Sequence, residues 1–169
     1  NKVDLDFSEN ALYVEPVGDY SIILAAYLIS SSNVIASPAW YTQIEGNPNI
    51  QSLDINENNV YISGFYQYAG ADFDPSDNEV KPKKDSGGYL VSYSLGDGSF
   101  NWFQEFDGQS NNNLTASNDM VTISFGKLNE TFSNSGKEYK LDGENVFLNF
   151  TSDGSLLWYK EHNSSNGGG

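Results

Sequence analysis

A cluster of acidic side chains in the middle of the chain has the composition of a cation site. Four carboxylates fall within eight residues: Asp72, Asp74, Asp77 and Glu79. Ca²⁺ binds several carboxylate oxygens at once, and extended backbone would place Asp72 and Asp74 on the same side. The spacing lacks the central glycine and terminal glutamate of an EF-hand loop. Calcium is therefore the candidate cofactor. The favoured alternative is a hydrated acidic loop with an Asp-Pro turn, neutralised by Lys83 and Lys84.

Other residues with catalytic chemistry are sparse. His162 is the only histidine and the chain has no cysteine, which excludes disulfides, thiolate metal sites and multi-histidine sites. There is no Gly-x-Ser-x-Gly elbow and no phosphate-cradling glycine loop. A carboxylate pair for glycoside hydrolysis leaves no sequence signature, because its spacing is set by the fold. Since no catalytic set stands out, we expect a protein that is not an enzyme.

Four Asn-x-Ser/Thr sequons are modification sites if the source organism glycosylates its secreted proteins. Asn149 lies inside an expected strand, where an attached glycan would have no room. The three candidate acceptors are the remaining asparagines: Asn113, Asn129 and Asn163.

All three tryptophans occupy one slot of a repeated pattern. Trp40, Trp102 and Trp158 stand 62 and then 56 residues apart, each opening a strand after a polar turn. A period of this size is typical of stacked or radial repeat folds. Aromatic rings also form sugar-binding platforms, but equivalent repeat positions favour core packing between repeats. The exposure of each indole decides between the two.

The elements that position these residues are short strands. A short apolar strand precedes each tryptophan strand, and a hairpin precedes that pair, most clearly at residues 6–14 and 54–62. The Glu-Asn pair at the centre of each hairpin predicts a turn, because Asn tolerates the left-handed backbone conformation. The repeat is thus four short strands. With no helical periodicity anywhere, we predict an all-β fold of four-stranded antiparallel units.

Two segments interrupt the pattern, at residues 66–86 and 126–145. One strand, residues 22–26, is apolar on both faces and is predicted to lie buried between two sheets.

The charge and hydrophobicity of the chain restrict the classes of partner that it can bind. The 169 residues carry 23 acidic against 8 basic side chains, a net charge of −15. This acidic excess disfavours nucleic acid and anionic membranes as partners, because both bind basic surfaces. No apolar run reaches the roughly 20 residues of a membrane span, so we expect no membrane insertion. Because the chain begins at Asn1 without a signal peptide, we interpret it as a mature or excised piece of a longer protein.

The repeat resembles the bacterial β-propeller repeats of the SBBP type. The resemblance is carried by residues 52–65, 71–75 and 88–108, and covers most of residues 4–162. The third copy lacks the Asp-Phe-Asp-Pro segment, and the first lacks the Asp-Gly turn. The resemblance implies propeller blades and a secreted or cell-surface protein, and it implies no particular ligand.

The repeats are predicted to form one all-β domain over residues 1–162, followed by a flexible tail at 163–169. A half-unit at 4–18 and another at 146–162 flank units at about 19–65 and 88–125, giving about three blades. Propellers typically close with at least four blades, and open edges invite pairing. The favoured interpretation is an incomplete arc of a larger propeller. Copies that associate into a ring, or a β-sandwich, are the alternatives.

These observations predict a non-catalytic scaffold or adhesion module, extracellular or on the cell surface, that binds protein or glycan. One alternative is a surface-filament subunit that self-associates through open sheet edges. The other is a propeller that binds or cleaves glycans.

Overall fold

The computed structural model describes residues 2–6, 11–17, 21–29, 37–46, 48–67, 70–108 and 113–163. Within these ranges the regular elements are all strands, and the all-β prediction is confirmed. Among the described residues there is no helix long and apolar enough to span a bilayer.

The strands pair only with antiparallel neighbours. In chain order they are β1 (Val3–Asp4), β2 (Tyr13–Val14), β3 (Ser21–Ala26), β4 (Trp40–Glu45), β5 (Pro48–Ile55), β6 (Asn59–Tyr66), β7 (Gly87–Ser94), β8 (Phe100–Phe106), β9 (Asn113–Ser117), β10 (Met120–Phe125), β11 (Leu128–Asn134), β12 (Lys137–Gly143), β13 (Asn145–Thr151) and β14 (Leu156–His162).

The strands form two four-stranded sheets and three pairs. One sheet has the order β5-β6-β7-β8 and the other β14-β13-β10-β9, while β1-β2, β3-β4 and β11-β12 are separate pairs. No sheet closes into a barrel, an arrangement compatible with incomplete blades or with a sandwich.

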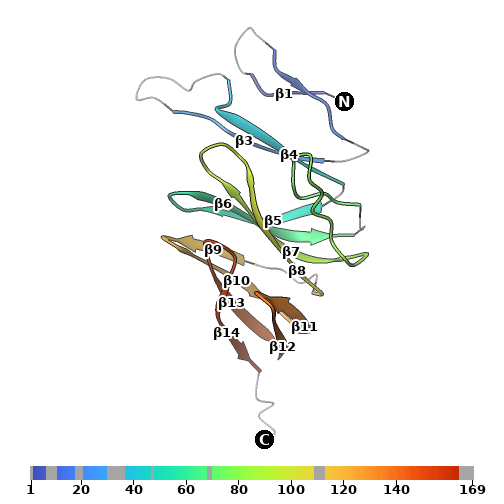
Figure 1. Cartoon of the computed structure of the whole chain (residues 1–169), viewed down its shortest axis with the longest axis vertical. Coiled ribbons are helices and arrows are strands. Elements are labelled where there is room, and N and C mark those ends of the chain that lie inside the picture. Colours follow the sequence, from blue (N-terminus) through green and yellow to red (C-terminus); the bar gives the residue numbers. More distant parts are fainter. Residues whose placement is uncertain are drawn as a thin grey trace, which may run out of the picture.

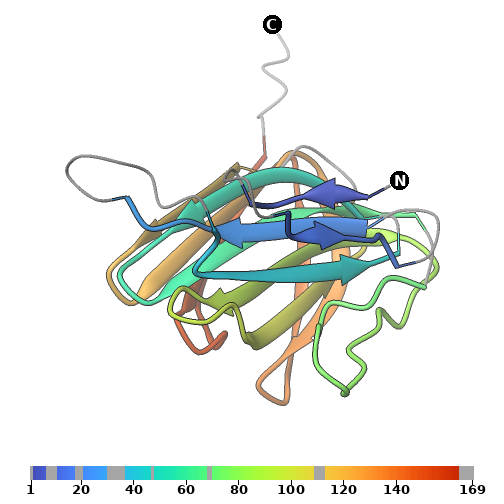
Figure 2. The ribbon, with the colours of Figure 1, turned by 90° about the horizontal axis from the view of Figure 1, so that it is seen from above.

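The sheets stack along the longest axis of the molecule (Figure 1). We call β1–β4 the first unit, β5–β8 the second unit, and β9–β14 the third unit. Seen from above, the sheets lie over one another (Figure 2). The contact between the first two units is the first junction, and that between the second and third units is the second junction.

The grouping of strands differs from the predicted boundaries. In the second unit the four expected strands lie in one sheet. The hairpin is β5-β6, the apolar strand is β7, and the tryptophan strand is β8. However, the predicted unit 19–65 joins β3-β4 to half of the next sheet, and the predicted unit 88–125 joins β7-β8 to β9-β10. The first unit is two pairs rather than one sheet.

The hairpin turn between β5 and β6 forms as its residue types predict. The Asn56 side-chain oxygen accepts hydrogen bonds from the backbone N–H groups of Asn58 at 3.0 Å and Asn59 at 2.8 Å. Such Asx turns mimic a backbone turn and fix where the strands reverse. The matching turn of the first hairpin falls at residues 7–10, outside the described residues.

The turns before β8 and β14 share an Asp-Gly-Ser sequence. Gly98 and Gly154 have φ of +74° and +85°, which side-chain-bearing residues rarely adopt. Asp97 Oδ1 accepts from the Ser99 backbone N–H at 3.1 Å, and Asp153 Oδ1 accepts from the Ser155 N–H at 3.2 Å.

Both predicted interruptions are packing elements. Residues 70–86, between β6 and β7, bury Ala71 and Phe73 in the first junction. Residues 126–145, between β10 and β13, contain the hairpin β11-β12, which buries Leu128 and Phe132 in the second junction. We call these two segments the inserts. Each lies between the second and third strands of its sheet.

The core is divided between the two junctions. The buried apolar residues of the first junction are Ile44, Val60, Ile62, Tyr66, Ala71, Phe73, Tyr89, Val91 and Tyr93. Those of the second junction are Tyr61, Leu90, Phe106, Leu114, Val121, Ile123, Phe125, Leu128, Phe132, Leu141, Val146, Leu148 and Phe150. The strands buried on both faces are therefore β6 and β7, whereas the predicted one, β3, is only partly buried.

The free edge of β9 is covered by side chains of β5. Ser52 Oγ accepts a hydrogen bond from the Leu114 N–H at 3.3 Å, and Asp54 Oδ2 accepts from the Ala116 N–H at 2.8 Å. These amides face away from β10, so neighbouring side chains satisfy donors that an edge strand otherwise leaves open.

Candidate functional site

A large cleft lies against the acidic loop. It measures about 690 Å³ and is lined by residues from the first unit, the 70–86 insert and the turn before β8. Its acidic lining residues are Glu45, Asp72, Asp74 and Asp97. Tyr41 and Phe100 add aromatic surface.

Two of the four predicted calcium ligands, Asp72 and Asp74, line this cleft, but their oxygens already bind backbone. Asp72 Oδ1 accepts from the N–H groups of Val80 at 2.9 Å and Asp74 at 3.1 Å. Asp74 Oδ1 accepts from the Ser76 N–H at 3.0 Å. These bonds close the loop as a series of Asx turns.

The other two predicted ligands point elsewhere. Asp77 and Glu79 are exposed and are not among the residues lining the cleft. Glu79 pairs with Lys81 at 2.7 Å, and this hydrogen bond raises the pKa of the Lys81 ammonium. Within the described residues, no three or more Asp, Glu or His side chains gather as a metal site. Calcium at this loop stays a prediction from sequence.

A second polar cluster was not found from the sequence. Glu105, on β8, accepts hydrogen bonds from the Tyr66 hydroxyl and from the backbone N–H groups of Lys83 and Lys84. The Lys84 ammonium pairs with Asp107 at the end of β8, and Lys83 contributes its backbone N–H to Glu105. Burial and the nearby Glu105 raise the pKa of Tyr66 well above its ordinary value.

Glu130, on β11, is the most perturbed carboxyl of this cluster. It is only 5% exposed, and burial raises its pKa to about 7. Its Oε2 accepts from the Asp107 N–H, while Oε1 has no partner among the described residues. A carboxyl with a pKa near neutrality has the property of a general acid.

The position of Glu130 does not match that chemistry. A cleft of about 410 Å³ opens beside the cluster and is lined by Lys81, Lys84 and Glu105 among others, but not by Glu130. A general acid must lie within hydrogen-bond reach of a bound substrate. Glu130 instead faces the second junction, between Leu128 and Phe132 on the buried side of β11. Its raised pKa is a property of the core.

Two tryptophans bind the next unit in the same way. Trp40 Nε1 donates to the Leu95 carbonyl at 2.8 Å, and Trp102 Nε1 donates to the Ser152 carbonyl at 2.8 Å. In both cases the ring covers the positive-φ glycine of the turn. A Cβ built on Gly98 would lie 2.5 Å from the Trp40 ring, and one on Gly154 would lie 2.7 Å from the Trp102 ring. We call this arrangement the Trp–Gly contact.

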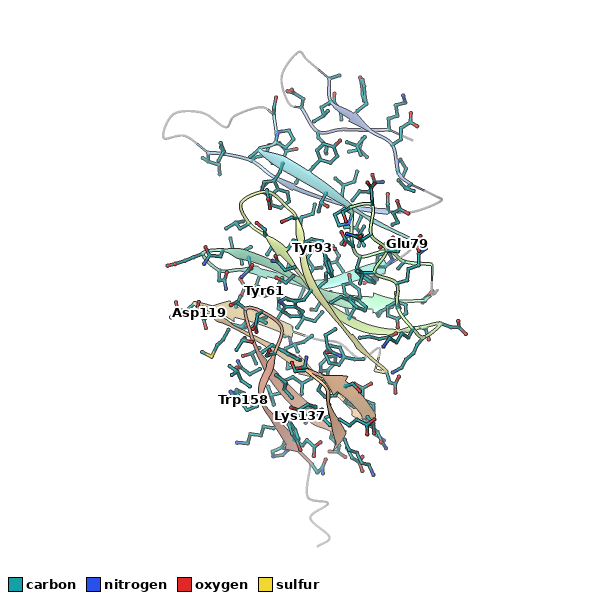
Figure 3. The ribbon with its side chains drawn as sticks, in the orientation of Figure 1. Tyr61, Glu79, Tyr93, Asp119, Lys137 and Trp158 are labelled. Carbon is teal, nitrogen blue, oxygen red and sulfur yellow. The ribbon has the colours of Figure 1, made fainter. Side chains whose placement is uncertain are left out.

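Trp158 differs from the other two. It is the third residue of β14, and 48% of its surface is exposed. It lies on the last sheet of the stack (Figure 3). The prediction of core packing thus describes Trp40 and Trp102, which are partly buried, whereas Trp158 has the exposed indole that the sugar-platform alternative requires.

The three candidate glycosylation sites Asn113, Asn129 and Asn163 are exposed. Asn149 is buried, and its Nδ2 donates to Thr122 Oγ1 at 2.7 Å. His162 is exposed at the end of β14. The last six residues of the predicted tail, 164–169, lie outside the described residues.

No family model, no curated protein and no solved structure matches the chain.

Proposed function

We propose that this chain is a non-catalytic scaffold or adhesion module of stacked four-stranded β-units, extracellular or on the cell surface, that binds protein or glycan. The repeated Trp–Gly contact carries the proposal. Trp40 and Trp102 hold one unit to the next through indole hydrogen bonds. In the acidic loop, carboxylate oxygens accept hydrogen bonds from the backbone of the loop itself. The β-propeller interpretation of these units is part of the same proposal.

The acidic cleft is the surface best suited to a protein partner. Four carboxylates surround a space of about 690 Å³ with aromatic rings beside them. Hydrogen bonding by Ser99 lowers the pKa of Asp97, so this carboxylate stays ionised well below neutral pH. A partner with a basic, partly aromatic segment complements this lining.

The test combines binding with turnover. Purified chain is applied to a glycan array and to a peptide array of basic segments, and is incubated with soluble polysaccharides. We expect binding without hydrolysis, and we expect the variant Asp74→Asn/Asp97→Asn to lose peptide binding. The matched control is Asp85→Asn, an exposed acid that does not line the cleft.

Hydrolysis of any polysaccharide that disappears in Glu105→Gln or Glu130→Gln would overturn the non-catalytic proposal. Filament assembly through sheet edges has one feature against it: the β9 edge is already bonded to Ser52 and Asp54. Glycan binding has one feature in its favour, the exposed Trp158.

A further inference from the structure

The outer face of the third unit repeats the face that the second unit uses for docking. In the second unit, Trp102 lies opposite Ser92 across β8 and β7. In the third unit, Trp158 lies opposite Asn149 across β14 and β13. The two tryptophans thus hold the same register position on successive sheets.

The neighbouring positions follow the same equivalence. Leu90, two residues before Ser92, is fully buried in the second junction. Phe147, two residues before Asn149, is 40% exposed, and Met120 on the adjacent strand is equally exposed. The third unit therefore presents two anchor positions of a junction, at Trp158 and Phe147, with the exposed Met120 on the same sheet and no unit packed on them.

What covers such a face is seen twice in the molecule. At each junction the following unit supplies a glycine of positive φ under the indole ring and a carbonyl that accepts from Nε1. The same unit also supplies an insert that fills the space beside this contact. Turn and insert together form a complementary surface for the tryptophan face.

Among the described residues, a second copy of the chain has no free turn of this kind. Its Gly98 and Gly154 turns are already covered by its own Trp40 and Trp102. In its first unit the corresponding connection, residues 27–39, contains no glycine. In self-association, the segment offered to the indole would therefore carry a side chain at every position, where both junctions have a glycine.

We propose that the outer face of the third unit is a docking surface for a further β-unit of the same build, supplied by a partner protein and carrying an Asp-Gly-Ser turn before its last strand. Trp158 is its anchor, donating to a turn carbonyl and covering the turn glycine. Phe147 and Met120 pack against the sheet that follows. This inference is independent of whether the chain is catalytic.

A tethered copy of the third unit can stand in for the partner, because tethering raises the effective concentration. The chain through His162 is extended by a second copy of residues 107–163. This repeats the connection that follows β8, since Phe106 and His162 each end their strand four residues after the tryptophan. Trp158→Phe in the second copy leaves three tryptophans to observe.

The readout is hydrogen exchange of the indole Nε1–H groups by NMR, with assignment by single Trp→Phe variants. In the parent chain we expect slow exchange at Trp40 and Trp102 and fast exchange at Trp158. In the extended chain, exchange at Trp158 is expected to slow by about tenfold or more, as a new buried hydrogen bond requires. Gly154→Val in the second copy alone is expected to restore fast exchange.

Folding of the added unit is measured separately by circular dichroism. If the second copy folds and Trp158 still exchanges fast, the proposal is overturned. If this copy stays unfolded, a copy of residues 46–108, which carries the Gly98 turn, replaces it. Failure of both to fold on this face also overturns the proposal, because such units depend on a neighbour for support.

Two other occupants are outcomes of the same measurement. Concentration-dependent slowing of Trp158 exchange in the parent chain, with a dimer mass by light scattering, would assign the face to a second copy. Slowing on addition of chitin or glucan oligosaccharides would assign it to glycan. Either result contradicts the proposal.

Discussion

The two junctions share one contact and are filled by unrelated segments. In each, an indole donates to a turn carbonyl and covers a glycine of the next unit. The first junction is then filled by an irregular loop that places Phe73 between Phe103 and Tyr89, at ring-centroid distances of 4.5 and 4.7 Å. The second is filled by the regular hairpin β11-β12.

This difference between the junctions shows which features the repeat specifies and which features vary from one unit to the next. The Trp–Gly contact is specified by two residues at fixed positions and sets how successive sheets meet. The insert only has to supply apolar volume, so its length and secondary structure vary. We therefore expect the inserts to contribute most of the free energy of unfolding and the Trp–Gly contact to contribute the geometry.

The largest loss of stability is expected when a buried aromatic ring is removed from an insert. Phe73→Ala and Phe132→Ala each remove a buried ring from a junction, and each is expected to lower the free energy of unfolding by about 3–5 kcal/mol. Phe147→Ala, on the exposed outer face, is the control and is expected to cost under about 1 kcal/mol. The measurement is urea unfolding followed by circular dichroism. A loss at Phe73 no larger than that at Phe147 would show that the loop is not core.

The next effect comes from adding one methyl group under an indole. Gly98→Ala and Gly154→Ala combine positive-φ strain with a clash against a tryptophan ring, and we expect a loss of about 3 kcal/mol. Gly136→Ala is the matched control, because Gly136 also has positive φ, at +75°, but nothing within 4 Å of its Cβ position. It should lose about 1 kcal/mol by the same unfolding assay. Equal losses at all three glycines would mean that the rings contribute nothing.

The buried carboxyl of the second insert makes the stability of the second junction depend on pH. Burial raises the pKa of Glu130 from 4.5 to about 7. Because the folded pKa is the higher one, the native state binds more protons than the unfolded chain between these values. Stability is therefore lost as pH rises from about 5 to 7, by about 2 kcal/mol.

The measurement is amide hydrogen exchange in β10 and β13 against pH. Glu130→Gln is expected to flatten this dependence, and the exposed Glu138→Gln on β12 should leave it unchanged. An identical slope in Glu130→Gln and the parent chain would assign the pH dependence to other groups.

The smallest effect is expected at the indole hydrogen bond. Trp40→Phe and Trp102→Phe each keep an aromatic ring but leave the Leu95 or Ser152 carbonyl without its donor, at a cost of about 1 kcal/mol. Trp158→Phe is expected to change stability by less than about 0.5 kcal/mol, because its indole is half exposed. Differential scanning calorimetry of the three variants ranks them. A loss at Trp158 as large as at Trp102 would place its indole in a contact of comparable strength.

Much of the local structure could be predicted from the sequence. The all-β fold, the Asn-centred hairpin at 54–62 and the Asp-Gly turns follow from turn chemistry and strand length, and all are present. The unit boundaries could not be placed, because a strand pattern does not say which neighbour shares its sheet. That is decided by the connections between strands.

The candidate site was less predictable. The alternation of Leu128, Glu130 and Phe132 before an Asn-Ser-Gly turn is a hairpin signal that would have revealed β11-β12. The same alternation places a carboxyl among buried positions, which is the only sequence sign of the raised pKa of Glu130. The exposure of Trp158 has no local signal, because its surroundings match those of the other two tryptophans and only the following unit differs.

The capped edge of β9 has a consequence for how the chain folds. Its amides bond to Ser52 and Asp54, and these side chains are in place only once the second unit has docked. Until then the third unit exposes a strand edge that can pair with another molecule. Refolding yield should therefore fall with chain concentration, and Asp54→Ala should steepen that fall even where the native state survives.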